Sequence, residues 1–360
     1  MSQSPELKLS DNEHEQPLVS IIVYNYNYGQ YLRDCFESIL NQTYENFEIV
    51  FSDNASEDKS WEIACDYEKK NPGKIFLARN RKNFGTDANL ANCLAAKRGT
   101  FYCIMGSDDV LDPEFVATCV RIFKSNQKIM YVMTHRYILD EKGKRLDEAP
   151  FYDNSYVLHP PSQNSVYMMA AINPSISQVM YRTGGFTGGV RGIFNGQFYS
   201  ARIMDFIIAL KNPVAYVHKP LLGHRIHGDN QSLVANSNLM EIIGPYVLLH
   251  QFIELARPHG YNAVLEKYED GVKKLSSLSL RYSCRALLCG DITLFERYFY
   301  LARALDSKIA KSKTYCILQQ FDGSNQNEIK TLIANEKDLE FHRQNSYEPN
   351  PPFETISLNY

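Results

Sequence analysis

The sequence lacks the features that mark membrane, nucleic-acid-binding and disulfide-stabilised proteins. It has no apolar run of about 18 residues and nothing that resembles a signal peptide, so we expect a cytoplasmic protein, or one peripheral at the inner face of the membrane. The net charge is only -3, and no basic low-complexity tract is present, which gives no reason to expect nucleic acid as a partner. The eight cysteines form no C-x-x-C pair and are expected to be reduced core residues.

The chain of 360 residues, 44% of them hydrophobic, is long enough to bury a large core. Residues 1–16 are polar and predicted to be disordered. The spacing of apolar residues then predicts a main α/β domain over 17–236 and a helical region over 237–345. Residues 346–360 are proline-rich and are expected to form an extended tail.

Strand-like and helix-like segments alternate through the first third of the chain. Four mostly apolar runs read as strands: Leu18–Tyr24, Phe47–Phe51, Ile75–Ala78 and Phe101–Met105. Their alternation with helices of about 10 to 15 residues implies βαβ crossovers and a mainly parallel sheet. In such a sheet ligands bind at the carboxyl ends of the strands, so the residues that follow these runs are the candidates for a site.

Two adjacent carboxylates, Asp108 and Asp109, follow the fourth strand directly. Paired carboxylates at a strand end form a hard-oxygen site that suits Mg²⁺ or Mn²⁺. The alternative is that they cap a helix beginning near Pro113. Taken alone, a strand, two aspartates and a helix favour the cap. The polar residues at the ends of the other predicted strands favour metal binding instead, because they would lie at the same edge of the sheet.

The segment VSIIVYNYNYGQYLRDCFESILNQTYENFEIVFSDNASED resembles the opening of family 2 glycosyltransferases. GSDDVLDPEF and YVHKPLLGHRIHGDNQS extend the likeness in the expected order, over roughly 17–235. The resemblance implies a GT-A fold with a mainly parallel central sheet. It also implies a nucleotide-sugar donor, a divalent metal as cofactor, and inversion at the anomeric carbon.

The resemblance assigns the nucleotide to the strand ends. Tyr26, and also Tyr24, can offer an aromatic face to the base. Asp53 can accept hydrogen bonds from the base or ribose, although as an isolated residue it reads equally well as a turn or cap residue. Asp108, with Asp109, would hold Mn²⁺ or Mg²⁺ between the two phosphates and so stabilise the departing nucleoside diphosphate.

The later motif supplies the second half of that site. His227 matches a histidine that completes metal or diphosphate binding in many family members. Arg225 could pair with a phosphate through two hydrogen bonds. A lone histidine in a loop is more often a surface residue, but the clustering of two histidines and an arginine favours function here.

The catalytic base is where the likeness weakens. The family places an acidic pair before an amphipathic helix, and the best register puts Ile203 at the usual base position. Asp205, two residues later, is the candidate base, with Asp229 and Glu241 as the next places to look. Gly106 stands where an aspartate is common, which should weaken ribose contact more than metal binding. An altered or inactive member stays open.

These features predict an inverting glycosyltransferase that moves a sugar from a nucleoside-diphosphate sugar, with UDP favoured by family frequency, to a hydroxyl of a growing polysaccharide or glycolipid. One alternative is a non-catalytic sugar-nucleotide-binding protein. A sugar nucleotidyltransferase is less favoured, because the loop Tyr24–Tyr31 has one glycine and no lysine or arginine. The aromatic helices after 237 are expected to form core, with a homodimer contact or a peripheral membrane contact as the alternative.

Overall fold

A computed structural model describes residues 16–169, 175–185, 201–228, 238–334 and 355–358. The predicted disordered segment 1–16 lies almost wholly outside these ranges. The chain divides into two compact units. The sheet unit comprises 1–163, 174–227 and 346–360, and the helical unit comprises 164–173 and 228–345. The chain therefore leaves the sheet unit and returns to it at its C-terminal end.

The described part of the sheet unit forms one 11-stranded sheet. Its order is β11-β8-β10-β6-β9-β4-β1-β2-β3, with β5 paired to β10 and β7 to β6. Strands β1 to β4 are parallel neighbours, and β9 joins β4 to β6 as an antiparallel strand. The strands are β1 Val19–Asn25, β2 Phe47–Asp53, β3 Ile75–Arg79, β4 Phe101–Gly106, β5 Val110–Leu111, β6 Tyr131–Leu139, β7 Arg145–Leu146, β8 Tyr156–Leu158, β9 Val179–Arg182, β10 Val214–Arg225 and β11 Thr355–Ser357.

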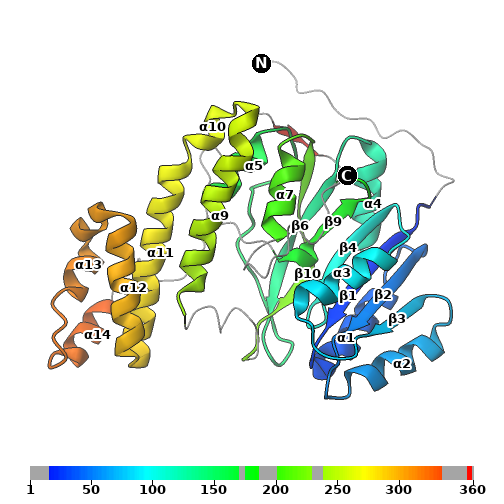
Figure 1. Cartoon of the computed structure of the whole chain (residues 1–360), viewed down its shortest axis with the longest axis horizontal. Helices are drawn as coiled ribbons and strands as arrows, with labels where there is room; N and C mark the ends of the chain where they lie inside the picture. The colour runs from blue at the N-terminus through cyan, green and yellow to red at the C-terminus, as the bar shows by residue number, and fades with distance from the viewer. Residues whose placement is uncertain (1–15, 170–174, 186–200, 229–237, 335–354, 359–360) are drawn as a thin grey trace. The chain divides into compact units, whose positions relative to one another are not determined.

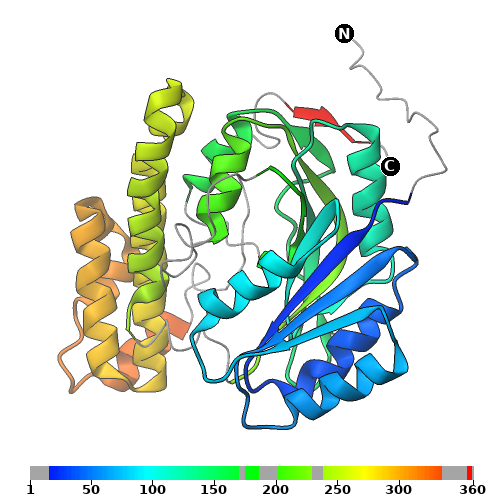
Figure 2. The same ribbon diagram turned by 45° about the vertical axis from the view of Figure 1, so that its right-hand side comes forward.

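Helices cover both faces of the parallel strands (Figures 1 and 2). Val19, Ile21 and Val23 of β1 share a core with α1, α2 and α4. Because side chains alternate along a strand, the other face of β1 and β2 is left for α3, whose Asn89 accepts a hydrogen bond from Ser52 at 2.6 Å. The helices of the sheet unit are α1 Gly29–Leu40, α2 Ser60–Lys70, α3 Thr86–Ala96, α4 Phe115–Ser125 and α7 Ala201–Ala209; the 3₁₀ turn η1 is Ile176–Gln178, and α5, Ser162–Tyr167, runs across the division between the units.

The register of the parallel strands brings their polar ends together. Asn25 at the end of β1 lies opposite Asp53 on β2, and Asp53 lies opposite Arg79 on β3. On the other side of β1, Tyr24 lies opposite Gly106, the last residue of β4. The predicted mainly parallel sheet is therefore confirmed, and its carboxyl edge carries the side chains that the sequence singled out.

Strand β10 extends well beyond the short apolar run Val214–Val217 with which it begins. It continues to Arg225, so His224 and Arg225 stand on a strand and not in a loop. Lys219 and Pro220 hide this continuation in the sequence, because they interrupt the apolar pattern. In the structure the ladder with β6 shifts register on both sides of Pro220 and then resumes.

The helical unit has a core of its own, built largely from the apolar faces of α11 and α12. Its helices are α9 Met240–Ala256, α10 Asn262–Leu265, α11 Tyr268–Cys289, α12 Ile292–Leu305, α13 Lys313–Leu318 and α14 Gln326–Ala334. No helix within the described ranges is long and apolar enough to cross a membrane.

Candidate functional site

The carboxylate pair sits in a tight turn at the end of β4. The Asp109 amide donates to the carbonyl of Gly106 at 3.2 Å, and the Gly106 amide donates to Ser177 Oγ at 3.0 Å. A Cβ added to Gly106 would lie 2.7 Å from Oδ1 of Asp108. Glycine at this position therefore leaves the Asp108 carboxylate room that any larger residue would take from it.

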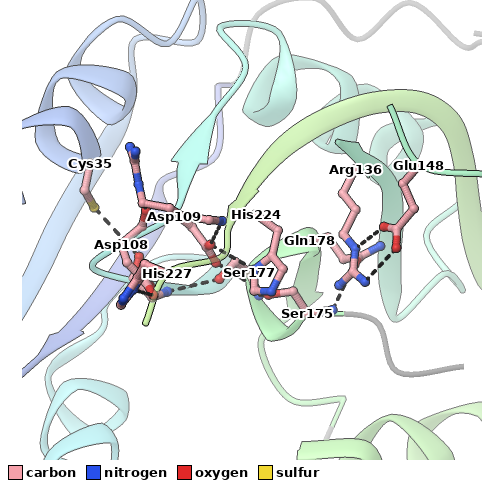
Figure 3. A network of polar contacts seen from close by, with 12 residues as sticks. Cys35, Asp108, Asp109, Arg136, Glu148, Ser175, Ser177, Gln178, His224 and His227 are labelled. Carbon is pink, nitrogen blue, oxygen red and sulfur yellow. Dashed lines mark hydrogen bonds and ion pairs between the residues drawn. The ribbon is translucent and has the colours of Figure 1, made fainter. Parts of the chain in front are cut away.

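Each carboxylate is paired with a histidine from the end of β10 or just beyond it (Figure 3). Nε2 of His227 lies 3.2 Å from Oδ2 of Asp108, and Nδ1 of His224 lies 3.0 Å from Oδ1 of Asp109. His227 is buried and its ring lies against those of Tyr28 and Tyr31. The structure thus joins the predicted residues Asp108, Asp109 and His227, and it adds His224.

Arg225 lies at the predicted place, but its groups are engaged inside the fold. Its amide donates to Asp109 Oδ1 at 3.0 Å, and its Nε donates to the carbonyl oxygen of Asp108 at 2.9 Å. Its Nη2 pairs with Asp34 at 2.9 Å, and its guanidinium lies over the ring of Tyr31. These contacts show a residue that shapes the turn, while the predicted phosphate contact of Arg225 stays a prediction.

The electrostatics distinguish the two aspartates. Burial, together with the charge of Asp109, raises the pKa of Asp108. Burial also disfavours the Asp109 carboxylate, but His224, Ser177 and the Arg225 amide outweigh burial and lower the pKa of Asp109. Burial and the charges of the two carboxylates also raise the pKa of Tyr24. The turn concentrates negative charge that a cation would offset.

The divalent metal that the family likeness implies can be tested against these side chains. Two neighbouring ligands of an octahedral ion at about 2.1 Å stand about 3 Å apart. Asp108 and His227 present an oxygen and a nitrogen 3.2 Å apart, so they fit as two such ligands. No group of three or more His, Cys, Asp or Glu side chains in the described ranges is arranged to hold a metal. Within the described ranges, Asp108 and His227 are thus two of the ligands that such an ion would need.

Of the residues predicted to bind the nucleoside, Asp53 is less available than the sequence suggested. Asp53 is fully buried, and its carboxylate accepts from Asn25 at 3.0 Å, from Ser56 Oγ at 2.5 Å and from the Ser56 amide at 3.0 Å, while Arg79 Nε lies 3.2 Å away. A carboxylate has about four lone-pair positions, and all are used here. Tyr26, by contrast, follows β1 at the same edge and is 41% exposed.

A buried polar network lies behind Asp109 (Figure 3). Ser175 Oγ lies 3.5 Å from Asp109 Oδ2, and the Ser175 amide donates to Gln178 at 2.9 Å. Gln178 in turn accepts from Arg136, which pairs with Glu148 at 2.6 Å. Sequence reasoning missed this network. Its only local signal is the Ser-x-x-Gln spacing of a capping box, which the structure shows at η1.

Asp205 lies inside a buried ion pair. Its side chain is 0% exposed, its Oδ2 lies 2.6 Å from Arg202 Nη1, and Oδ1 accepts from Tyr181 at 2.7 Å. Burial raises the pKa of Asp205, against the opposing effects of Arg202 and Tyr181. These contacts favour a structural role, and the predicted role as base stays untested. Asp229 lies outside the described residues, and Glu241 belongs to the helical unit.

Comparisons with known proteins agree with this architecture. A model of glycosyl transferase family 2 matches residues 20–195. An uncharacterized glycosyltransferase of Methanocaldococcus jannaschii is 32% identical over 138 residues, which are 38% of this chain and 47% of that protein. Chondroitin synthase of Escherichia coli is 27% identical over 222 residues, 60% of this chain and 30% of that protein. The chain thus spans less than half the length of these relatives.

Two solved structures are similar at low identity. S. aureus TarS 1–349 in complex with UDP-GlcNAc has a TM-score of 0.48 and 15% identity, and covers 86% of this chain and 91% of its own. The mannosyltransferase PcManGT from Pyrobaculum calidifontis, in complex with GDP-Man and Mn²⁺, has a TM-score of 0.49 and 13% identity, covering 93% and 88%. From the family match, with the parallel sheet and its carboxylate-bearing edge, the chain belongs to the family 2 glycosyltransferases and has their GT-A fold.

Proposed function

We propose that the protein is an inverting glycosyltransferase, which moves a sugar from a nucleoside-diphosphate sugar to a hydroxyl group of a saccharide or glycolipid. The observation that carries the proposal is the pair Asp108 and Asp109 at the carboxyl end of β4, each with its own histidine, within a family 2 domain. The similarity to chondroitin synthase supports a saccharide acceptor. UDP is the first nucleotide to test.

In this proposal Asp108 and His227 hold a Mn²⁺ or Mg²⁺ ion, with Asp109 behind them. When bound, the ion neutralises charge on the departing diphosphate. Asp109 keeps Asp108 in place indirectly, because it binds the Arg225 amide while Arg225 holds the carbonyl of Asp108. In the buried turn Asp109 thus acts as an internal support for Asp108.

The remaining residues bind and orient the donor. The exposed ring of Tyr26 gives the base a surface to stack on, and Asp53 fixes the β1 and β2 ends that carry it. An acceptor oxygen then attacks the anomeric carbon as the bond from that carbon to the phosphate oxygen breaks. A single displacement of this kind inverts the configuration. The candidate for the base that takes the acceptor proton is Asp205, two residues after the position that the family register gives the base, and it would have to leave its ion pair with Arg202.

The test is donor turnover with Mn²⁺, measured on UDP-, GDP- and dTDP-sugars. The transferase predicts slow hydrolysis of one donor class by the wild-type chain, and its loss in Asp108→Asn. Asp66→Asn, at an exposed acid on α2, serves as the matched control. Pyrophosphate released from a nucleoside triphosphate and a sugar phosphate would instead indicate a nucleotidyltransferase.

A second candidate is a sugar-nucleotide-binding protein without transferase activity. The buried ion pair of Asp205 and the presence of Ile203 at the usual base position favour it. It predicts tight, metal-dependent binding of a sugar nucleotide, with neither hydrolysis nor transfer above the uncatalysed rate. Binding and turnover measured on the same preparation separate the two candidates.

A further inference from the structure

His224 differs from the other three side chains at the carboxylate pair in its exposure. Its side chain is 29% exposed, whereas those of Asp109, His227 and Asp108 are 3%, 1% and 11% exposed. The sequence singled out His227, which proves to be almost fully covered. His224 is therefore the histidine of this site that a bound molecule can reach.

The orientation of the His224 ring follows from its partner. Nδ1 lies 3.0 Å from a carboxylate oxygen of Asp109, and an ionised carboxylate only accepts hydrogen bonds. The hydrogen of the neutral ring is thus on Nδ1, and Nε2 carries a lone pair. Within the described residues Asp109 is the only hydrogen-bond partner of His224. In that tautomer Nε2 is an acceptor with no donor among the described residues.

Asp109 is itself held firmly, so the ring has a defined direction. Its carboxylate also accepts from the Arg225 amide at 3.0 Å and lies 3.5 Å from Ser175 Oγ. His224 stands at the end of β10, opposite Ile138 in the ladder with β6. Both the strand and the carboxylate fix the position of the imidazole, which is what a group that selects a ligand requires.

We propose that His224 is a donor-binding residue, whose Nε2 accepts a hydrogen bond from a hydroxyl of the sugar being transferred. This inference rests on the proposed function. A lone pair needs a donor, which a hydroxyl supplies and an ionised phosphate does not. Asp109 adjoins Asp108, where the diphosphate would be bound, and the donor sugar is attached directly to that diphosphate. We therefore assign the contact of His224 to the sugar.

The experiment compares His224→Phe with the wild type by calorimetry in the presence of Mn²⁺, using UDP, GDP, UDP-glucose, UDP-N-acetylglucosamine and GDP-mannose. Phenylalanine keeps a planar ring and removes the acceptor. Loss of one hydrogen bond of ordinary strength weakens binding by about 2- to 12-fold. We expect the best wild-type sugar nucleotide to bind His224→Phe about 5- to 10-fold more weakly, while the affinity for the bare nucleoside diphosphate stays within about twofold.

Further variants keep the result interpretable. His224→Gln can still offer an oxygen and should recover part of the affinity for the sugar nucleotide, and it replaces His224→Phe if that chain fails to fold. His259→Phe, at an exposed histidine of the helical unit, should behave as wild type. Equal weakening of UDP and UDP-sugar, or no weakening of either, overturns the inference. A wild-type chain that binds none of the nucleotides overturns the proposed function itself, and the inference with it.

Discussion

Individual residues at the carboxyl edge of the sheet fall into two groups, those bound within the fold and those exposed to solvent. Asp53 and Arg225 are predicted binding residues whose polar atoms are engaged in the fold, so they act first as supports for the strand ends. Tyr26 and His224 are the exposed members of the same edge. The division suggests that contact with the donor falls to the exposed residues, and that the buried ones set their positions.

Removal of the Tyr26 ring should weaken nucleotide binding. Stacking of a base on an aromatic side chain contributes about 1 to 3 kcal/mol in nucleic-acid binders, so Tyr26→Ala should lose about 5- to 150-fold in affinity for the nucleoside diphosphate. Calorimetry with UDP and Mn²⁺ measures the effect. Tyr300→Ala removes a 65% exposed ring from the helical unit and should leave binding unchanged. Equal affinity in Tyr26→Ala and wild type would exclude the stacking role.

The substitution Asp205→Asn tests whether Asp205 is the catalytic base or a structural member of a buried ion pair. The buried contacts to Arg202 and Tyr181 predict a structural effect, because removing one partner of a buried pair typically costs about 3 to 5 kcal/mol. Urea denaturation of Asp205→Asn should therefore show a clear loss of stability, whereas Asp66→Asn should show almost none. If the variant keeps wild-type stability and donor affinity but loses transfer, Asp205 is the base after all.

The sequence predicted some of these residues and missed others for a physical reason. Asp108, Asp109 and His227 were predictable because each follows a recognisable motif. The contact between His224 and Asp109 joins residues 115 positions apart, so no local pattern announces it. The saturation of Asp53 was also invisible, because it depends on a turn and on neighbouring strands that donate to the same carboxylate.

At the scale of elements, the pattern of apolar residues predicted the parallel strands β1 to β4 well and the later strands poorly. Runs such as Phe101–Met105 are apolar at every position, as expected for strands buried on both faces. β10 contains Lys219 and Pro220, and β6 carries the polar sequence Thr134, His135, Arg136 in its middle, so neither reads as a simple strand. The three polar residues of β6 are buried, because they contact Gln178 of the network behind Asp109 and the segment that carries Glu148.

His135 on β6 should make the stability of the sheet unit depend on pH. Its Nε2 donates to the carbonyl of Glu148 at 2.9 Å, and its buried Nδ1 has no partner among the described residues. Burial, helped by His218 and Arg136, lowers the pKa of His135 to about 4. The unfolded chain binds a proton near pH 6.5, and the folded chain does not until about pH 4. The free energy of unfolding should therefore fall as the pH is lowered through that window.

Urea titrations at several pH values between about 7 and 4.5 measure this effect. His135→Gln keeps a donor for the Glu148 carbonyl and cannot be protonated, so its stability should fall less steeply with pH than that of the wild type. His259→Gln, at an exposed position, should keep the wild-type slope. Parallel pH profiles for His135→Gln and the wild type would contradict the prediction.

At the scale of the whole molecule, the chain closes the sheet with its own C-terminal end. Thr355–Ser357 form β11 on the outer side of β8, and the Leu358 amide donates to the carbonyl of Ser155 at 2.9 Å. Leu358 is 7% exposed and belongs to the core that also contains Val157. The segment covers a strand edge that would otherwise be open to pairing with other chains.

Leu358→Ala should destabilise the sheet unit selectively. Truncation of a buried leucine costs about 2 to 5 kcal/mol, and this site at the margin of the core should fall at the lower end. Hydrogen exchange should become faster in β8 and in β10, which pairs with it, while α11 and α12 keep their protection because their core is separate. Ser357→Ala, at the exposed neighbour in β11, is the matched control. Uniformly faster exchange in both units would show that they unfold together, and unchanged exchange would show that β11 contributes nothing to the sheet.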